Sequence, residues 1–141
     1  MTAVINSFTG PYRFLSNFYV APLRVIGISY ENSEAAYQAC KTTDTNLRKT
    51  FSKLAPNEAK KLGKTIPLRE NWDTVTRVEC MELVLRAKFM GNPQLMDWLV
   101  ATGDAELIEG NTWGDTFWGI CRGRGTNYLG KLLMEVRKDN R

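Results

Sequence analysis

The most regular pattern in this sequence is a long helical stretch at residues 73–90. Its apolar residues Val78, Met81, Leu85 and Phe89 recur every three or four positions, which places them on one face of an α-helix. A glycine follows the stretch directly and ends it. An apolar face of this kind has to be covered by other elements, so we interpret it as the core face of a folded domain.

Shorter helices and a few strands are expected around this helix. Helices are predicted at residues 33–41, 44–52, 56–63, 93–103 and from 127 onward, and strands at residues 3–8, 20–30 (two, around Gly27) and 105–109. Residues 10–19 and 111–126 lack periodicity and are predicted as ordered loops, the longer of which is a candidate functional segment. The predicted fold class is α+β, a single helix-rich domain over residues 1–141 with a small β-sheet.

The chain length and the cysteine positions restrict the number of domains and the cellular compartment that we expect for this protein. A chain of 141 residues has room for one core, and no apolar run approaches the roughly 20 residues that span a bilayer. The first residues lack a basic segment followed by an apolar one, so neither a secretory signal nor membrane contact is expected. Cys40, Cys80 and Cys121 form no CxxC pair, which favours neither a disulfide scaffold nor a zinc site. A reduced, cytoplasmic setting is therefore predicted.

Histidine is absent from the sequence. Its absence excludes a Ser-His-Asp or Cys-His nucleophile and a metal centre held by histidine. If the chain is an enzyme, its proton transfers fall to Asp, Glu, Lys, Tyr or Cys.

Charge is distributed unevenly along the chain, although the net charge is only +4. Residues 41–69 carry +6 and residues 116–141 carry +4, whereas residues 70–115 carry −6. Solvated helix faces that pair with each other would explain this pattern. The alternative is a positive rim around a site that uses carboxylates, which would attract a phosphate-bearing ligand or a nucleic acid.

Four side chains that can carry chemistry share one face of the helix predicted at residues 33–41. Glu34, Tyr37, Gln38 and Lys41 are separated by three or four positions, so a carboxylate, a phenol, an amide and an amine project together. An exposed polar face with a weak ion pair is the alternative interpretation.

Two carboxylates, Glu109 and Asp115, lie among the aromatic residues Trp113, Phe117 and Trp118. Aromatic walls lower the local dielectric and raise the pKa of a carboxyl group, and they can also stack on a nucleobase. The alternative is an aromatic core with solvated acids between its members.

Two further segments carry weaker signals. The stretch RGRGTN at residues 122–127 combines glycines, arginines and a helix start, which makes it a candidate phosphate seat or an ordinary basic turn. In PYRFLSNFY at residues 11–19, Arg13 and Asn17 stand among aromatic residues. A buried asparagine there could fix the loop or contact a ligand.

Several segments resemble motifs of one family. They occur in the same order as in that family and extend along nearly the whole chain. They are FLSNFY (14–19), SEAAYQACK (33–41), LRAKF with NPQL (85–89 and 92–95), and TGDAELIEGNTWGDTFWG followed by GRGTNYLGKLLMEVR (102–137). The combination resembles the NADAR domain, the family that includes the YbiA-like N-glycosidases. The resemblance implies hydrolysis of N-glycosidic bonds to ribose, with no metal and no other cofactor.

The resemblance also implies a set of site residues. Glu34 and Lys41 match the acid and the lysine of the family's SE helix motif, Asp115 matches its D-x-[FY]-W-G element, and Glu109 matches the acid before that element. These four are the expected catalytic residues. The expected substrate-binding residues are Arg13, Asn17, Phe18, Tyr37, Trp118, Gly119, Arg124 and Asn127.

Removal of ADP-ribose from ADP-ribosylated guanine in nucleic acid is the first substrate hypothesis that the resemblance implies. The alternatives are a riboflavin-pathway N-glycosidase that splits phosphoribosylamino-pyrimidines, and a module that binds ADP-ribose or NAD without turnover. The expected partner is thus ADP-ribosylated nucleic acid or a small molecule that contains ADP-ribose, and no obligate protein partner is inferred. Lys41 is the candidate nucleophile or electrostatic partner, with Glu34 as its proton-transfer partner.

Overall fold

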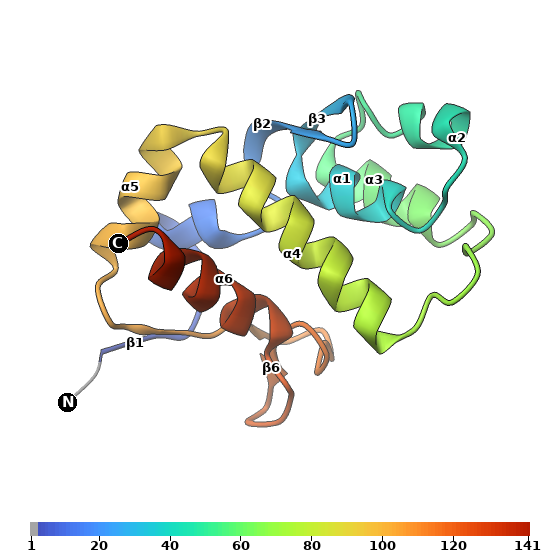
Figure 1. Ribbon diagram of the computed structural model, residues 1–141. Coiled ribbons are helices and arrows are strands. Elements are labelled where there is room, and N and C mark those ends of the chain that lie inside the picture. Colours follow the sequence, from blue (N-terminus) through green and yellow to red (C-terminus); the bar gives the residue numbers. More distant parts are fainter. Residues whose placement is uncertain (1–2) are drawn as a thin grey trace. The chain divides into compact units, whose positions relative to one another are not determined.

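A computed structural model describes residues 3–141 of the chain. It divides into two compact units, one formed by the residues up to 16 together with residues 93–141, and the other by residues 17–92. Figure 1 labels the elements of both units. The two units are described in turn below.

The unit of residues 17–92 combines one hairpin with four helices. Strand β2 (Val20–Val25) pairs antiparallel with β3 (Ile28–Asn32). Ile26 and Gly27 connect the two strands with positive φ angles of 47° and 78°, as the tightest hairpin turns require. The helices are α1 (Ser33–Ala39), α2 (Thr45–Lys49), α3 (Pro56–Gly63) and α4 (Thr74–Met90).

Helix α4 holds this unit together. It packs on β2 and on α1, while α1 also packs on α3, as Figure 1 shows for the helices around α4. Met81, Leu85 and Phe89 are buried as their spacing predicts. Residues 78 and 83 are less covered, so the buried stripe is narrow and runs along the side of α4 that faces the hairpin and α1.

The other unit is built from short parallel strand pairs, one 3-10 helix and two α-helices. Strand β1 (Val4–Ile5) pairs with β4 (Glu106–Leu107), and β5 (Gly110–Asn111) pairs with β6 (Ile120–Cys121). The 3-10 helix η1 spans Gly10–Leu15, and the α-helices are α5 (Pro93–Ala101) and α6 (Tyr128–Asp139). Helix α6 packs on α5 and β4 through its buried residues Leu129, Leu132, Leu133 and Val136.

The structure confirms the predicted fold class and refines several elements. Helix α3 has the predicted bounds, and α4 begins one residue after its predicted start, because Asp73 caps it. The stretch 10–19, expected as a loop, contains the 3-10 helix η1. Instead of one small sheet, residues 3–141 form three two-stranded sheets, because two of the pairings are ladders of only two residues that the loops bring together. Among these residues, no helix is both long and apolar enough to cross a membrane.

Candidate functional site

The helix α1 begins at an asparagine cap and is buried along its whole length. Asn32 Oδ1 accepts a hydrogen bond from the backbone N–H of Ala35 at 2.8 Å, which satisfies one of the free amides at the helix start. Every residue of α1 is buried, including Glu34, Tyr37 and Gln38. The polar face predicted from the spacing is therefore an interior face, and the interpretation as an exposed face with a weak ion pair is wrong.

The carboxylate of Glu34 is held within this face. Gln38 Nε2 donates to Glu34 Oε1 at 3.0 Å, one helical turn away. Gln38 itself packs against α3, because a Cβ atom at Gly63 would lie 1.9 Å from Gln38 Oε1. Only glycine fits at position 63 without moving this amide, so α3 fixes the group that orients the carboxylate.

Lys41 lies just beyond the end of α1 and is half-buried. Its Nζ donates to the backbone carbonyl of Gly63 at 3.3 Å. Burial lowers the pKa of the Lys41 amine, the nearby Glu34 carboxylate opposes this effect, and the positive charges of Arg77 and Lys64 lower the pKa further. The structure thus places a lysine of reduced basicity beside a buried carboxylate.

Tyr37 lies on the same face with its ring near Trp72, at 6.0 Å between the ring centroids. Burial raises the pKa of Tyr37 to about 12, and a hydrogen bond to Arg77 works against that rise. The phenol is therefore neutral at physiological pH. Sequence reasoning missed Arg77 and Trp72, because they come from α4 and from the segment that precedes it, where no spacing links them to α1.

Asn17 and Phe18 precede the hairpin of the same unit. The backbone carbonyl of Asn17 accepts from the Glu34 N–H at 3.1 Å, and Asn17 Oδ1 accepts from Ser33 Oγ at 2.9 Å. Asn17 therefore fixes the start of α1. Phe18 is 45% exposed, and the Lys60 ammonium lies 5.8 Å from the centre of its ring, so an aromatic surface and a cation lie side by side.

In the other unit, Asn111 ties the two predicted carboxylate positions together. Its Nδ2 donates to Glu109 Oε2 at 3.1 Å and to the backbone carbonyl of Asp115 at 2.8 Å. Its Oδ1 accepts from the backbone N–H of Asp115 at 3.0 Å. Sequence reasoning missed Asn111, although its position between Glu109 and Asp115 in a glycine-rich loop was the available signal.

The carboxylate of Asp115 supports the loop that carries it. Its Oδ1 accepts from the backbone N–H groups of Phe117 and Trp118 at 3.1 and 2.9 Å. Among the described residues, Oδ2 has no hydrogen bond. Asp115 therefore has a structural task on one oxygen and leaves the second oxygen for other chemistry.

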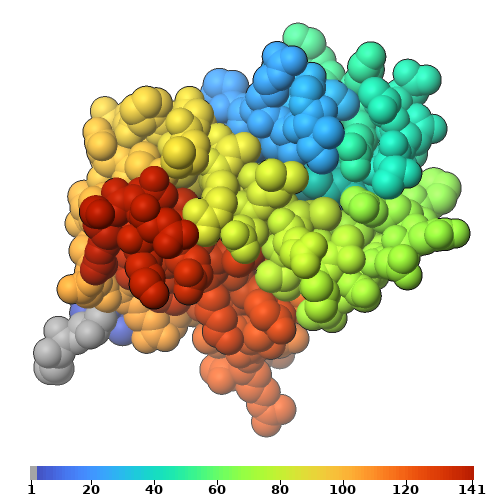
Figure 2. Space-filling view, viewed as in Figure 1, coloured from blue at the N-terminus to red at the C-terminus, as the bar shows by residue number. Residues whose placement is uncertain are grey.

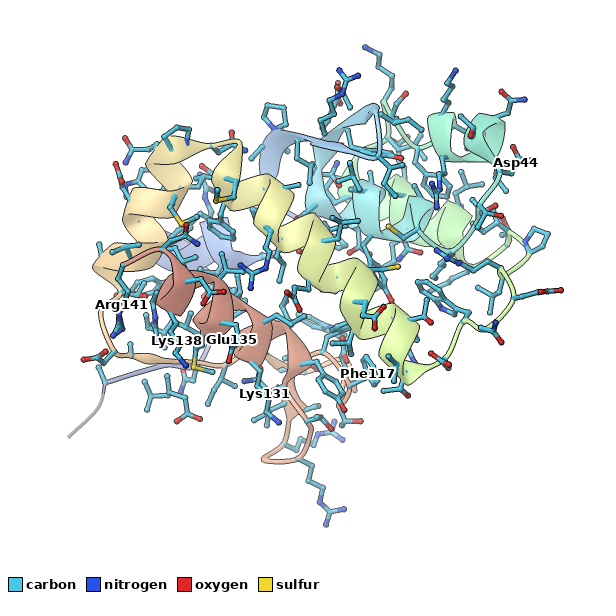
Figure 3. All side chains as sticks on the ribbon, in the orientation of Figure 1. Asp44, Phe117, Lys131, Glu135, Lys138 and Arg141 are labelled. Carbon is cyan, nitrogen blue, oxygen red and sulfur yellow. The ribbon has the colours of Figure 1, made fainter. Side chains whose placement is uncertain are left out.

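Aromatic rings gather next to this loop, at the start of α6. The rings of Phe117 and Trp118 meet edge to face at 4.7 Å, and Phe117 lies 4.8 Å from Tyr128. Figure 3 labels Phe117 near the first turn of α6. Trp118 is partly exposed, so it combines a packed edge with accessible surface.

Gly119 and Asn127 connect the carboxylate loop to α6. A Cβ atom at Gly119 would lie 1.9 Å from Glu109 Oε2, so the close approach of the chain at residues 109 and 119 requires glycine. Asn127 adopts a left-handed conformation with φ 58°. Its Oδ1 accepts from the Glu109 N–H at 3.0 Å, and its Nδ2 donates to the carbonyl of Leu107 at 2.9 Å.

Asn127 stands at the predicted start of α6, but its contacts are not those of a helix cap. Its side chain does not cap the helix. The N–H groups of Tyr128 and Leu129 donate to the carbonyls of Phe117 and Trp118 at 3.1 and 3.0 Å. Because loop carbonyls already occupy these amides, phosphate binding at this end would rest mainly on side chains.

The arginines predicted to bind phosphate are exposed. Arg122 and Gly123 form a tight turn with positive φ angles, closed by two hydrogen bonds between Cys121 and Arg124. This turn projects beyond the start of α6, as the orange-red segment shows in Figures 1 and 2. Arg13 lies in η1 and is exposed as well.

Each unit thus holds one part of the predicted set. Residues 17–92 bring together Asn17, Glu34, Tyr37 and Lys41 around the start and the buried face of α1. Residues 93–141 bring together Glu109, Asp115, Gly119 and Asn127 through direct hydrogen bonds and close contacts. Among residues 3–141, no group of three His, Cys, Asp or Glu side chains could hold a metal ion.

Comparison with known proteins gives a consistent family relationship. The NADAR domain model matches residues 6–141. The N-glycosidase YbiA of Escherichia coli strain K12 is 38% identical over 96% of this chain and 87% of its own length. An N-glycosidase of Nostoc punctiforme is 33% identical over 100% of this chain and 94% of its own.

A solved structure and a second type of relative extend this relationship. The NMR structure of E. coli YbiA matches 99% of this chain and 86% of its own, with a TM-score of 0.85 at 36% sequence identity. A riboflavin biosynthesis protein of Vibrio vulnificus is 38% identical over 89% of this chain, which corresponds to 35% of that protein.

Proposed function

The chain belongs to the NADAR family and is an N-glycosidase, and from this premise we propose that it removes ADP-ribose from ADP-ribosylated guanine in nucleic acid. The observation that carries the proposal is the electrostatic interaction of the Glu34 carboxylate with the Lys41 amine. An amine of lowered pKa lies beside a buried carboxylate, and both groups are suited to break a bond between ribose and nitrogen.

The chemistry of this bond explains why such a pair is useful. As the glycosidic bond breaks, positive charge develops on the anomeric carbon and negative charge on the departing base. A carboxylate stabilises the first charge, and a proton donor neutralises the second. We propose that Glu34 transfers the proton and that Lys41 acts on the sugar carbon.

Lys41 has two possible roles in this proposal. As a nucleophile, its neutral amine attacks the anomeric carbon while the base leaves with a proton, and ring opening gives a Schiff base that water then hydrolyses. As an electrostatic partner, the protonated amine orients Glu34 and forms no covalent bond. Burial favours the neutral amine, which supports the nucleophilic role.

Residues 93–141 carry groups whose chemistry also suits a ribosylated substrate. We propose that Asp115 Oδ2 holds a ribose hydroxyl or activates water, with Glu109 as the second candidate. Trp118 would stack on the base or sugar. Arg13, Arg122 and Arg124 would bind phosphate, while Gly119 and Asn127 would hold the loop in place. Tyr37 and Asn17 would contribute on the side of α1.

A basic surface supports a polyanionic substrate over a small one. Lys49, Lys53, Lys60, Lys61 and Lys64 are all exposed. Three of these lysines lie on or directly after α3, and Lys60 lies beside the exposed ring of Phe18. Cations beside an aromatic surface are typical of proteins that bind single-stranded nucleic acid.

A substrate panel tests the proposal directly. Mass spectrometry should detect free ADP-ribose after incubation with a guanine-ADP-ribosylated oligonucleotide, and little release from a phosphoribosylamino-pyrimidine. Preference for the pyrimidine would support the riboflavin-pathway alternative instead, to which the Vibrio vulnificus relative points. A Glu34→Gln variant serves as the control for turnover by this site.

Salt and charge variants test the nucleic-acid part of the proposal separately. The KM for the oligonucleotide should rise with ionic strength, and replacement of Lys60, Lys61 and Lys64 by Gln should raise it further. Replacement of Lys131 and Lys138, which are exposed on α6 (Figure 3), is the matched control. An unchanged KM after replacement of Lys60, Lys61 and Lys64 would exclude these lysines from substrate binding.

We also propose a cytoplasmic location for the protein, which three free cysteines support.

A further inference from the structure

Two cysteine thiols meet inside the unit of residues 17–92. Cys40 lies at the C-terminal end of α1, and Cys80 lies on α4, which packs against α1. Their side chains are hydrogen-bond partners, although the residues are far apart in sequence. Both are free thiols, so the fold places two thiols where they interact without joining them.

The two thiols differ in their access to solvent. Cys40 is only 3% exposed, whereas Cys80 is intermediate. A small solute can therefore reach Cys80 while Cys40 remains covered behind it. Sensor pairs in which an accessible thiol is oxidised first and a neighbouring thiol resolves the product have this arrangement.

Positive charge surrounds the pair. Arg48 and Arg69 both act electrostatically on the two thiols. Backbone contacts hold both guanidinium groups in place: Arg48 Nε donates to the carbonyl of Thr42 at 2.8 Å, and Arg69 Nη1 donates to the carbonyl of Cys40 at 3.4 Å. A fixed cationic environment stabilises a thiolate.

The environment divides the reactivity between the two sulfur atoms. The hydrogen bond from Cys40 lowers the pKa of Cys80 to about 7, and the two arginines act in the same direction, while burial and Glu79 oppose them. The same hydrogen bond and burial raise the pKa of Cys40. A large fraction of Cys80 is thus thiolate at neutral pH, whereas Cys40 keeps its proton.

We propose that Cys80 and Cys40 are a modification site at which peroxide forms a reversible intramolecular disulfide, with Cys80 as the attacking thiolate and Cys40 as the resolving thiol. Because Lys41 follows Cys40 directly, the bond would tie the end of α1 that carries this lysine to α4. Both cysteines belong to one compact unit, so the bond can form within that unit.

The reaction balances with hydrogen peroxide as the oxidant. The Cys80 thiolate attacks one peroxide oxygen, the O–O bond breaks, and hydroxide leaves, so sulfur is oxidised to sulfenic acid and peroxide is reduced. The Cys40 sulfur then attacks Cys80 sulfur, and the hydroxyl group leaves as water with the Cys40 proton. The hydroxide takes up the proton that Cys80 released earlier. One peroxide and two thiols give one disulfide and two water molecules, and a dithiol reductant reverses the change.

Tryptic mapping of the oxidised full-length protein tests the proposal, because each cysteine falls on its own peptide: residues 25–41, 78–86 and 89–122. After mild peroxide treatment, the intact protein should lose the mass of two hydrogen atoms, and the non-reduced digest should contain peptides 25–41 and 78–86 linked. Dithiothreitol should restore both peptides. A linkage that involves peptide 89–122, or over-oxidation of Cys80 without linkage, would overturn the proposal.

Three single variants separate the roles of the thiols. Cys40→Ser should stop at the sulfenic acid on Cys80, which dimedone traps, and Cys80→Ser should not react under the same conditions. Cys121→Ser is the matched control, since Cys121 is buried elsewhere, and it should form the linkage as the wild type does. If Cys40→Ser and Cys80→Ser fail to fold, limited alkylation of the wild-type protein tests the assignment instead. Alkylation should then modify Cys80 before the other cysteines. Fastest alkylation at Cys121 or Cys40 would contradict the assignment.

Discussion

Gln38 Nε2 donates to Glu34 Oε1 at 3.0 Å within the buried face of α1. The other side-chain atom of this amide, Oε1, has no hydrogen-bond partner in the described part of the chain. Gln38 therefore donates a hydrogen bond to the carboxylate and tolerates a buried, unsatisfied oxygen, which costs free energy in a folded protein. A side chain kept under such a cost is expected to have a task, and orienting Glu34 is that task.

Variants of these two residues should lose activity in a fixed order. Glu34→Gln removes the carboxylate and should lower kcat by roughly 10²-fold or more, as loss of an acid–base group does. Gln38→Leu keeps the volume but removes the donor, so it should lower kcat by at least roughly 10-fold, because a hydrogen bond to a charged group contributes about 1.5–3 kcal/mol. Steady-state kinetics on the ADP-ribosylated oligonucleotide measure both effects.

The exposed Gln94 on α5 provides the control for the second variant. Gln94→Leu makes the same chemical change outside α1 and should leave kcat unchanged. Wild-type turnover in Gln38→Leu would show that Glu34 needs no orienting partner.

Lys41 should form a covalent adduct if it is the nucleophile. Borohydride added during turnover reduces a Schiff base to a stable amine, and trypsin does not cleave after a modified lysine. The adduct should therefore appear on a peptide of residues 25–48 instead of 25–41, and mass spectrometry should find it. The Lys41→Ala protein should show no adduct, whereas Lys53→Ala, which changes an exposed lysine, should show it in full.

The covalent route has a clear counter-result. Absence of an adduct in the wild type, together with near-normal turnover of Lys41→Ala, would end it. Absence of an adduct with strongly reduced turnover would assign Lys41 to the electrostatic role instead.

Two variants of Asp115 should separate its structural role in the loop from a catalytic role. Asp115→Asn keeps an oxygen that can accept from the N–H groups of Phe117 and Trp118, so thermal unfolding should change little. The same variant loses the charge and should lower kcat by roughly 10²-fold if the carboxylate acts in catalysis. Asp115→Ala loses both hydrogen bonds and should also reduce the free energy of unfolding by about 1–3 kcal/mol. Full activity in the Asn variant would leave Asp115 with a structural role only.

The sequence predicts best those elements whose ends are marked locally. Helix α3 has its predicted bounds because Pro56 fits the first helical turn and Gly63 ends it. Helix α2 begins close to its predicted start, because the Asp44 side chain caps it (Figure 3). The 3-10 helix η1 was not predicted, because six residues are too few to show a periodic pattern. The pair β1–β4 joins segments far apart in sequence, and the pair β5–β6 closes a single loop. Both ladders are only two residues long, so no periodic pattern indicates them.

The candidate site shows the same division between local and non-local information. The spacing of Glu34, Tyr37 and Lys41 predicts that they share a face. Helix α1 carries the first two, and Lys41 lies just beyond its end. Burial of that face depends on α3 and α4, so composition alone could not distinguish it from an exposed face. Arg77, which lies close to Tyr37 and Lys41, comes from another helix and leaves no trace in the sequence around α1.

Lys88 makes stability depend on pH in a direction unusual for a lysine. Its side chain is fully buried, and burial lowers its pKa from 10.5 to about 7. Between about pH 7 and pH 10 the unfolded chain still binds the proton that the folded protein has lost. The unfolded state binds more protons in this range, so the free energy of unfolding should rise with pH, by up to about 1.4 kcal/mol per pH unit.

Urea denaturation at several pH values from about 7.5 to about 9.5 measures this rise, and a Lys88→Met variant should show a smaller one. Part of the rise should persist, because the lowered pKa of Cys80 acts in the same direction. The range ends below pH 10 because burial raises the pKa of Tyr30 and of Tyr37 to about 12. Above pH 10 the folded protein keeps these phenol protons longer than the unfolded chain does, so stability should fall again. The control is Lys53→Met, at an exposed position, which should keep the wild-type slope. Equal slopes in the wild type and in Lys88→Met would show that Lys88 retains its charge in the folded protein.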